Sequence, residues 1–124
     1  MRLPITAAAL FIAMGATAYA DNVGSAPAFS AGQTVAVCFY SNVGPSALTF
    51  TSSFIYAEPG GPLTEVSETC NGNLAGFARC RTVANVPSNA AVWCRAVVSK
   101  KSNLRGRLEI RNASGVTLTS EVSR

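Results

Sequence analysis

The sequence predicts an all-β protein, an antiparallel two-sheet sandwich of about seven to eight strands, with a small closed β-barrel as the alternative. Short runs of β-branched and aromatic residues recur along the chain, and turns rich in Gly, Pro and Asn separate them. After residue 20, no segment longer than about ten residues has a helical period. Four cysteines accompany this pattern and suggest a disulfide framework.

Residues 1–20 are predicted to be a secretory signal peptide. They contain one basic residue, Arg2, an apolar run over 7–16, and the cleavage pattern Ala18-Tyr19-Ala20 before Asp21. The apolar run is shorter than the ~20 residues that a membrane-spanning helix needs. We therefore expect cleavage after Ala20, a secreted or periplasmic location, and no transmembrane segment in the mature chain.

The mature chain, beginning at Asp21, is expected to be one domain, because about 100 residues can bury a single core. Residues 21–33 are rich in Ser, Ala, Gly and Pro, and are predicted to be a flexible segment or a frayed first strand. Residues 34–124 are predicted to form the single β-sandwich domain. Its strands are expected at 34–41, 47–56, 63–70, 77–86, 90–99, 104–111 and 116–122.

Two of these predictions specify which residues face each other. The alternation in 47–56 places Leu48, Phe50, Phe54 and Tyr56 on one face. The last two strands are predicted to form a hairpin around residues 112–115, closed by a type I turn with a glycine bulge. In that register Ile110 faces Leu118, which matches the apolar faces of the two strands.

The cysteines are expected to form two disulfides, since no pair has the C-x-x-C spacing of a zinc or thioredoxin-like site. They are Cys38, Cys70, Cys80 and Cys94. The favoured pairing joins Cys38 to Cys94 across the core and Cys70 to Cys80 around a polar loop. Closing these loops would contribute about 4 and about 2 to 3 kcal/mol, respectively. The rival pairing joins Cys80 to Cys94 and Cys38 to Cys70, but its hairpin sets two arginines directly opposite each other.

Two short turns suggest a family resemblance. Residues 29–34 and 74–77 each place an apolar residue and a glycine just before a strand that carries a cysteine. This pattern resembles the turn that leads into a strand in small exported bacterial immunoglobulin-like β-sandwich modules, and the resemblance implies the same sandwich fold. The chain differs from antibody-type domains because Trp93 lies next to the last cysteine instead of on an earlier strand.

The composition argues against an enzyme. Histidine is absent, which excludes Ser-His-Asp and Cys-His catalysis. Glu65 and Glu68 are three residues apart on a predicted strand, so they should point to opposite faces. Lys100 and Lys101 lie in a polar turn, where lysines are solvated and protonated. We therefore expect no catalytic residues, no cofactor and no metal site.

A charged surface is the main candidate for a binding site. If Cys94 points inward, Trp93 and Arg95 face outward. A hairpin centred on Ser102 would place Arg95 beside Glu109 and Trp93 beside Arg111, pairing opposite charges and a cation with an aromatic ring. The candidate binding residues are therefore Trp93, Arg95, Lys100, Lys101, Arg105, Arg107 and Arg111.

These observations predict an exported, non-enzymatic binding or envelope-associated module. Its partner would be an anionic polysaccharide, a lipid head group or an acidic protein. The net charge is only +4 and a single candidate aromatic is exposed, so nucleic acid is not expected. A structural alternative stays open, in which the charges only keep a strand solvated and prevent edge-to-edge pairing. The alternative function is a small secreted enzyme inhibitor that inserts a loop from 57–62 or 71–79.

Overall fold

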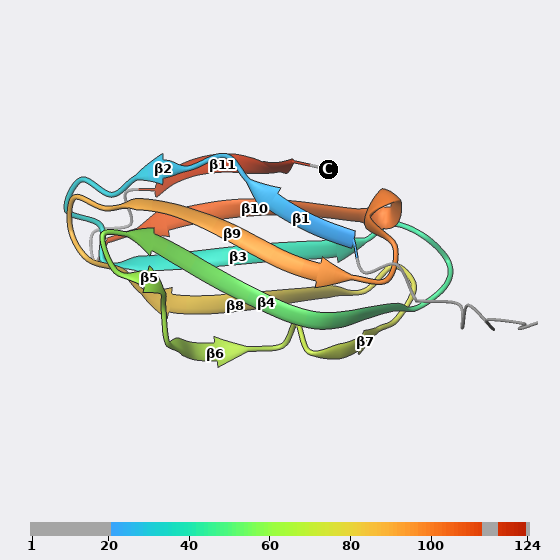
Figure 1. The fold of residues 1–124 in the computed structure, drawn as a ribbon. Coiled ribbons are helices and arrows are strands. Elements are labelled where there is room, and N and C mark those ends of the chain that lie inside the picture. The colour runs from blue at the N-terminus through green and yellow to red at the C-terminus, as the bar shows by residue number, and fades with distance from the viewer. Residues whose placement is uncertain (1–20, 113–116, 124) are drawn as a thin grey trace, which may run out of the picture.

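The computed structural model describes residues 21–112 and 117–123, which form an almost entirely β structure (Figure 1). The predicted signal peptide and most of the predicted hairpin turn lie outside the described residues. The strands are β1 (Asp21–Ser25), β2 (Ala28–Phe29), β3 (Val35–Asn42), β4 (Leu48–Glu58), β5 (Gly61–Pro62), β6 (Glu65–Glu68), β7 (Gly72–Leu74), β8 (Arg79–Asn85), β9 (Ala91–Val98), β10 (Leu104–Arg111) and β11 (Thr117–Ser123). One 3-10 turn, η1 (Lys101–Asn103), lies between β9 and β10.

The strands form two antiparallel sheets that pack face to face, which confirms the predicted sandwich. Sheet A contains β1, β2, β4, β5, β7 and β9, and sheet B contains β3, β6, β8, β10 and β11. Strand β11 also pairs with β1, and so connects the two sheets along one side. The strand order runs from β5 to β6 without a ladder between these two end strands in the described chain, so the sheets do not close into a barrel.

The core lies between the sheets and is held by a disulfide across it. Cys38 of β3 is bonded to Cys94 of β9, with a Cα–Cα distance of 5.9 Å, and both residues are fully buried. Cys70 is bonded to Cys80, which confirms the favoured pairing and excludes the rival one. Among the largest buried apolar side chains are Tyr40, Leu48, Ile55, Val92, Val98, Leu104, Leu108 and Ile110.

The predicted alternation along β4 is wrong in its second half. Leu48 and Phe50 face the core, but Phe54 is 38% exposed, and Tyr56 lies on the outer face with it. The register between β4 and β9 shifts between Phe50 and Ser52, which indicates a β-bulge. The extra residue reverses which alternate positions face inward. Beyond the bulge the core-facing residues are Ser53, Ile55 and Ala57.

The predicted hairpin between the strands on either side of Ser102 is also wrong. Strand β9 pairs with β4, β1 and β2, whereas β10 pairs with β3 and β11. The turn η1 carries the chain from sheet A to sheet B (Figure 1). Cross-strand charge pairs contribute only about 0.2 to 1 kcal/mol, which is less than each strand gains by burying its apolar face between the sheets.

Both ends of the described chain take part in the sheets. Residues 21–33, for which a flexible segment or a frayed strand was expected, contain β1 and β2. Val23 of β1 is buried, and the Ser25 hydroxyl accepts a hydrogen bond from the Cys94 amide at 2.8 Å. At the other end, β10 and β11 pair with Ile110 opposite Leu118, as predicted. Among the described residues there is no helix with the length and hydrophobicity to span a bilayer.

Candidate functional site

The outer face of sheet B brings arginines from two separate strands together on either side of β3. Ser41 of β3 pairs with Arg105 of β10 on one side and with Arg79 of β8 on the other. Two residues earlier, Phe39 pairs with Arg107 and with Arg81. Residues directly opposite each other in a sheet share a face. The pairing therefore surrounds Phe39 and Ser41 with four arginines.

These side chains line a groove of about 530 Å³, which we call the arginine groove. Its lining residues are Phe39, Ser41, Thr69, Arg79, Cys80, Arg81, Arg105, Gly106 and Arg107. Among the described residues that line it, four are arginines and none is acidic. An anion that enters the groove would therefore meet cationic groups on both sides and an aromatic ring between them.

The four arginines are close enough to repel one another. Neighbouring strands lie about 4.8 Å apart and alternate residues about 6.8 Å apart, so the arginine Cα atoms outline a rectangle of about 10 Å by 7 Å. The electrostatic screening length at physiological ionic strength is about 8 Å. The repulsion is therefore only partly screened, and a bound anion would reduce it.

On the β10 side of the groove, interactions within the protein hold the arginines in place. Arg107 forms a salt bridge of 3.1 Å with Glu109, and Arg111 pairs with the same carboxylate. The guanidinium carbons of both arginines lie 5.6 Å from the centre of the Phe39 ring. Arg105 donates hydrogen bonds of 2.9 and 3.0 Å to backbone carbonyls of η1 and β10. One buried carboxylate is thus shared by two arginines and leaves one of their positive charges uncompensated.

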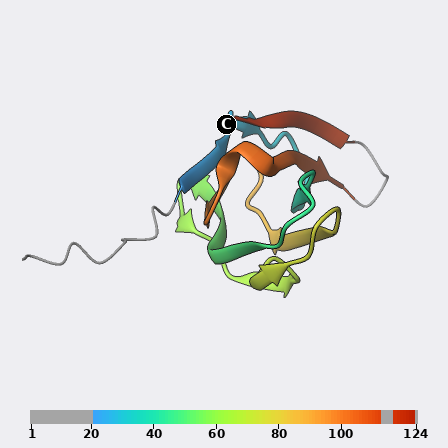
Figure 2. The ribbon, with the colours of Figure 1, turned by 90° about the vertical axis from the view of Figure 1, so that its right-hand side faces the viewer.

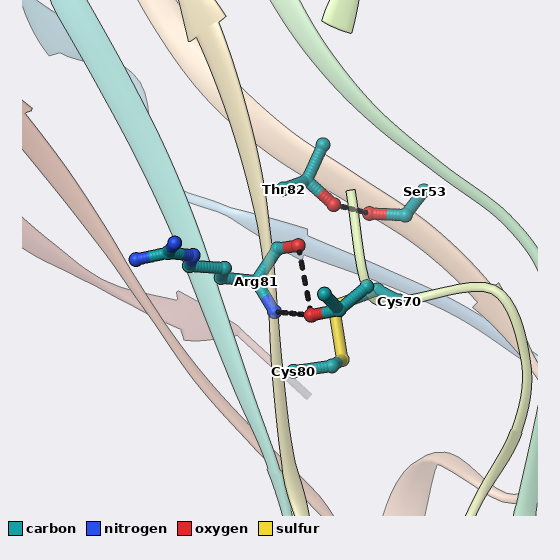
Figure 3. Close-up of a disulfide and its surroundings, with 6 residues drawn as sticks. Ser53, Cys70, Cys80, Arg81 and Thr82 are labelled. Carbon is teal, nitrogen blue, oxygen red and sulfur yellow. Dashed lines mark hydrogen bonds between the residues drawn. A yellow bond between two sulfur atoms is a disulfide. The ribbon is translucent and has the colours of Figure 1, made fainter. Parts of the chain in front are cut away.

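On the β8 side, Arg79 and Arg81 are exposed, and neither forms a salt bridge with a described residue. The backbone of Arg81 is nevertheless held firmly (Figure 3). Its amide donates to the Thr69 hydroxyl at 2.9 Å, and the same hydroxyl donates to the Arg81 carbonyl at 3.4 Å. The Thr69 amide also donates to this carbonyl, at 2.8 Å. The adjacent Cys70–Cys80 disulfide ties the same segment to β8. This wall of the groove is therefore rigid, while its guanidinium groups are available to a ligand.

The predicted binding residues divide between different parts of the molecule. Arg105 and Arg107 line the groove, and Arg111 lies beside it over Phe39. Lys100 and Lys101 are exposed at the end of the sandwich where η1 lies. Arg105, Arg107 and Arg111 occupy alternate positions of β10 and therefore share its outer face, as predicted.

Trp93 and Arg95 lie instead on the outer face of sheet A, on the other side of the sandwich. The Trp93 ring stacks on Tyr56 with a centroid distance of 5.7 Å, and Arg95 donates to the Asn22 side chain at 3.3 Å. Phe39, Arg79 and Arg81 were not predicted from the sequence to belong to the site. A usable signal was present, because two arginines that flank a core-facing cysteine must share the outer face of their strand.

The acidic pair Glu65 and Glu68 was predicted to point to opposite faces, and this prediction is wrong. The register between β6 and β8 shifts between Glu65 and Ser67, so the two carboxyl groups lie on the same side and hydrogen-bond to each other. Burial raises the pKa of Glu68 to about 7, and the hydrogen bond and negative charge of Glu65 add to the increase. The pair therefore retains a proton at a pH where isolated carboxyl groups have lost theirs.

A polar cluster lies on the inner side of the sheets near this pair. The hydroxyls of Ser53 and Thr82 hydrogen-bond across the sandwich at 2.7 Å (Figure 3). The Tyr40 hydroxyl is buried beside them without a hydrogen-bond partner among the described residues. Burial raises the pKa of Tyr40 well above its ordinary value; the neighbouring Ser53 hydroxyl lowers it, and the Glu68 carboxylate adds to the increase. Tyr40 therefore stays neutral and serves as a core residue.

No protein family, curated protein or solved structure matches this chain. The resemblance to immunoglobulin-like modules therefore stays a prediction. The arginine groove is the strongest basis on which to assign a function, because it combines a concave shape with an uncompensated charge.

Proposed function

We propose that this protein is an exported, non-enzymatic binding module that captures carboxylate, sulfate or phosphate groups in the arginine groove. The observation that carries the proposal is the convergence of four arginines on one groove whose described lining residues include no acidic group. Guanidinium groups bind such anions through pairs of parallel hydrogen bonds. The groove offers these donors from two opposite sides.

Two features favour ligand binding over a purely solvating role for these charges. The groove is lined by an aromatic side chain, Phe39, as well as by arginines, so it offers a ligand an apolar contact beside the cationic ones. The groove also lies in the middle of sheet B, across β10, β3 and β8, and not on an exposed edge strand. Preventing edge-to-edge pairing, the usual role of charges on β-strands, does not explain arginines at this position.

Export is supported by the two disulfides, because such bonds persist in oxidising compartments. The signal-peptide pattern of residues 1–20 supports the same location. The exported location also supports envelope association. Components of the cell envelope carry anionic groups that an exported anion-binding module would encounter. N-terminal sequencing of the exported protein should begin at Asp21.

The groove can be tested with two variants, one that removes arginines in the groove and one that removes an arginine outside it. The Arg79→Gln/Arg81→Gln variant removes the two groove arginines of β8, neither of which forms a salt bridge with a described residue, and Arg95→Gln removes an exposed arginine from the opposite sheet. Binding to inorganic polyphosphate is measured by calorimetry at several salt concentrations. Each bidentate guanidinium–phosphate interaction that this variant loses should weaken binding about tenfold.

The control should bind within about twofold of the wild type, since surface charges distant from the site have small effects. The proposal is supported if the groove variant binds polyphosphate weakly and the control does not. If the wild type does not bind polyphosphate, or if the groove variant and the control bind equally well, the proposal is wrong.

One observation favours the inhibitor as a second candidate. The segment closed by the Cys70–Cys80 disulfide carries Phe77, whose side chain is 72% exposed. A constrained segment with an exposed residue is what insertion into an enzyme cleft requires. Inhibition of a panel of secreted hydrolases by the wild type, lost in Phe77→Asn, would support this candidate.

A further inference from the structure

The end of the sandwich that faces the viewer in Figure 2 carries η1 and the loops between β3 and β4 and between β7 and β8. Each of these two loops has an exposed apolar side chain. Val43 follows β3 and is 46% exposed, and Phe77, just before β8, is the most exposed of the large apolar residues in the described chain. We call these two residues the apolar tip. Each lies two residues from a lining residue of the groove, Val43 from Ser41 and Phe77 from Arg79. The tip therefore lies next to the end of the groove that Ser41 and Arg79 line.

The two loops that carry the tip are firmly joined. The Phe77 amide donates to the Gly44 carbonyl at 3.1 Å, and the Val43 amide donates to the Asn103 carbonyl of η1 at 2.9 Å. A Cβ atom at Gly76 would overlap the Pro45 carbonyl, so the loops are in close backbone contact. The tip is therefore a fixed feature of the surface.

Buried Asn42 connects these loops to the end of β3. Its side-chain amide donates to the carbonyls of Ser46, Leu74 and Ala75 at 2.8, 3.2 and 3.2 Å, and its oxygen accepts from the Gly44 amide at 3.0 Å. These contacts hold both loops in one arrangement. A partner would meet the tip already ordered.

Phe77 has a backbone φ of 61°, in the left-handed region that aromatic residues seldom adopt. A strained backbone conformation that leaves a phenyl ring in solvent does not stabilise the isolated protein. The strain is instead consistent with a residue held in place for contact with a partner. Because a left-handed residue forms a bend, the segment does not present the extended backbone that pairs with a partner's strand.

Cationic residues surround the tip. Arg79 and Arg105 lie at the adjoining end of the groove, and Lys100 and Lys101 are exposed on or next to η1, which contacts Val43 through Asn103. Apolar side chains next to a cluster of basic residues match the two layers of an anionic membrane surface, its acyl chains and its phosphates. Soluble polyanions have no apolar layer for the tip to enter.

We propose that this end of the molecule docks on an anionic lipid surface, with Phe77 and Val43 inserted at the interface and lipid phosphates bound in the arginine groove. This proposal rests on the proposed function and names the source of the anion. Attachment through two side chains and a few charges is reversible, because stable anchoring needs a longer apolar group. Binding should weaken with added salt.

The test uses the full mature protein with its disulfides intact. Binding is measured to phosphatidylglycerol/phosphatidylcholine vesicles, to phosphatidylcholine vesicles, and to inorganic polyphosphate. Phe77→Asn removes the ring, and asparagine tolerates the left-handed backbone, so this variant should fold. Phe29→Ser is the matched control, since Phe29 is also exposed but lies in β2, opposite the first residue of β9 and away from η1.

The wild type should bind the phosphatidylglycerol vesicles and not the phosphatidylcholine vesicles. Phe77→Asn should weaken vesicle binding roughly 10- to 100-fold, the equivalent of one buried phenyl ring. It should leave polyphosphate binding unchanged, and Phe29→Ser should change neither. This combination supports the lipid proposal.

Other outcomes separate the two proposals. Polyphosphate binding without vesicle binding, or equal vesicle binding by wild type and Phe77→Asn, overturns the lipid proposal and leaves the arginine groove as an anion site. A Phe77→Asn variant that retains vesicle binding but loses enzyme inhibition assigns Phe77 to the inhibitor candidate. If the wild type binds neither polyphosphate nor vesicles, both the proposed function and the lipid proposal are wrong.

Discussion

Asn42→Asp is a sharp test of how the loops at the η1 end are held. The substitution keeps the shape of the side chain and its acceptor oxygen but removes the amide donor. Three backbone carbonyls, those of Ser46, Leu74 and Ala75, lie within 3.2 Å of that donor, and Asn42 is only 1% exposed. The variant therefore places a carboxyl group against carbonyl oxygens that it cannot satisfy when ionised.

The expected loss of stability follows from the donor count. An amide nitrogen carries two hydrogens, so at most two full hydrogen bonds are lost, each worth about 0.5 to 1.5 kcal/mol. Burying a carboxylate without a donor adds to this cost. We expect the free energy of unfolding to fall by about 3 kcal/mol, which is a large part of the roughly 5 to 15 kcal/mol of a typical domain.

Urea unfolding at pH 7 measures the change, with Asn73→Asp as the control. Asn73 is exposed and uses its side-chain oxygen to accept from the Thr49 hydroxyl at 2.9 Å, so aspartate preserves that bond while adding the same charge. The control should lie within about 0.5 kcal/mol of the wild type. If Asn42→Asp were as stable as Asn73→Asp, the buried amide would not be what holds the two loops.

Three further predictions concern the core, the acidic pair and the second disulfide. Tyr40→Phe should raise the free energy of unfolding by about 1 kcal/mol, because it removes a buried hydroxyl that has no hydrogen-bond partner among the described residues. A loss of stability in urea unfolding would show that the hydroxyl is bonded. The pKa of Glu68 is raised from 4.5 to about 7 in the folded protein, so its stabilising contribution is complete below about pH 4.5 and lost as the pH rises through 7. Thermal melts at pH 5 and pH 8 should therefore differ less in Glu68→Gln than in the wild type or in Glu58→Gln, and an equal difference in all three would contradict this. Cys70→Ser/Cys80→Ser should lose about 2 to 3 kcal/mol, and an unchanged melting temperature would show that the bond contributes nothing.

The sequence was sufficient to predict features that depend on local pattern. The sandwich could be predicted because runs of β-branched residues indicate strands and Gly or Pro residues indicate the turns between them. The register of Ile110 against Leu118 followed from matching apolar faces. The Cys38–Cys94 bond was favoured because it joins an early strand to a late one across the core.

Features that depend on a single inserted residue were not predictable. The bulges after Phe50 and after Glu65 reverse the inward positions of β4 and β6 without any glycine or proline to mark them. For this reason Phe54 was expected in the core, and Glu65 and Glu68 were expected on opposite faces.

The candidate site was predicted only in part, for a reason of topology. Arg105 and Arg107 were selected because they alternate along one strand. Arg79 and Arg81 join them only because β3 lies between β8 and β10 in the sheet, an order that strand spacing alone does not determine. The wrong hairpin prediction for β9 and β10 has the same cause, because strand spacing does not show that these two strands belong to different sheets.

The two disulfides are nested, with the first cysteine bonded to the last and the second to the third. Synthesis proceeds from the N-terminus, so Cys38, Cys70 and Cys80 are all available before Cys94 is made. If an oxidant acts on the emerging chain, the first cysteine available to Cys38 is Cys70, which is not its native partner. Correcting a Cys38–Cys70 bond requires attack by a free thiolate. Each chain that forms a Cys38–Cys70 bond must exchange it before the native pairing is reached, so the folding yield should respond to the thiol buffer.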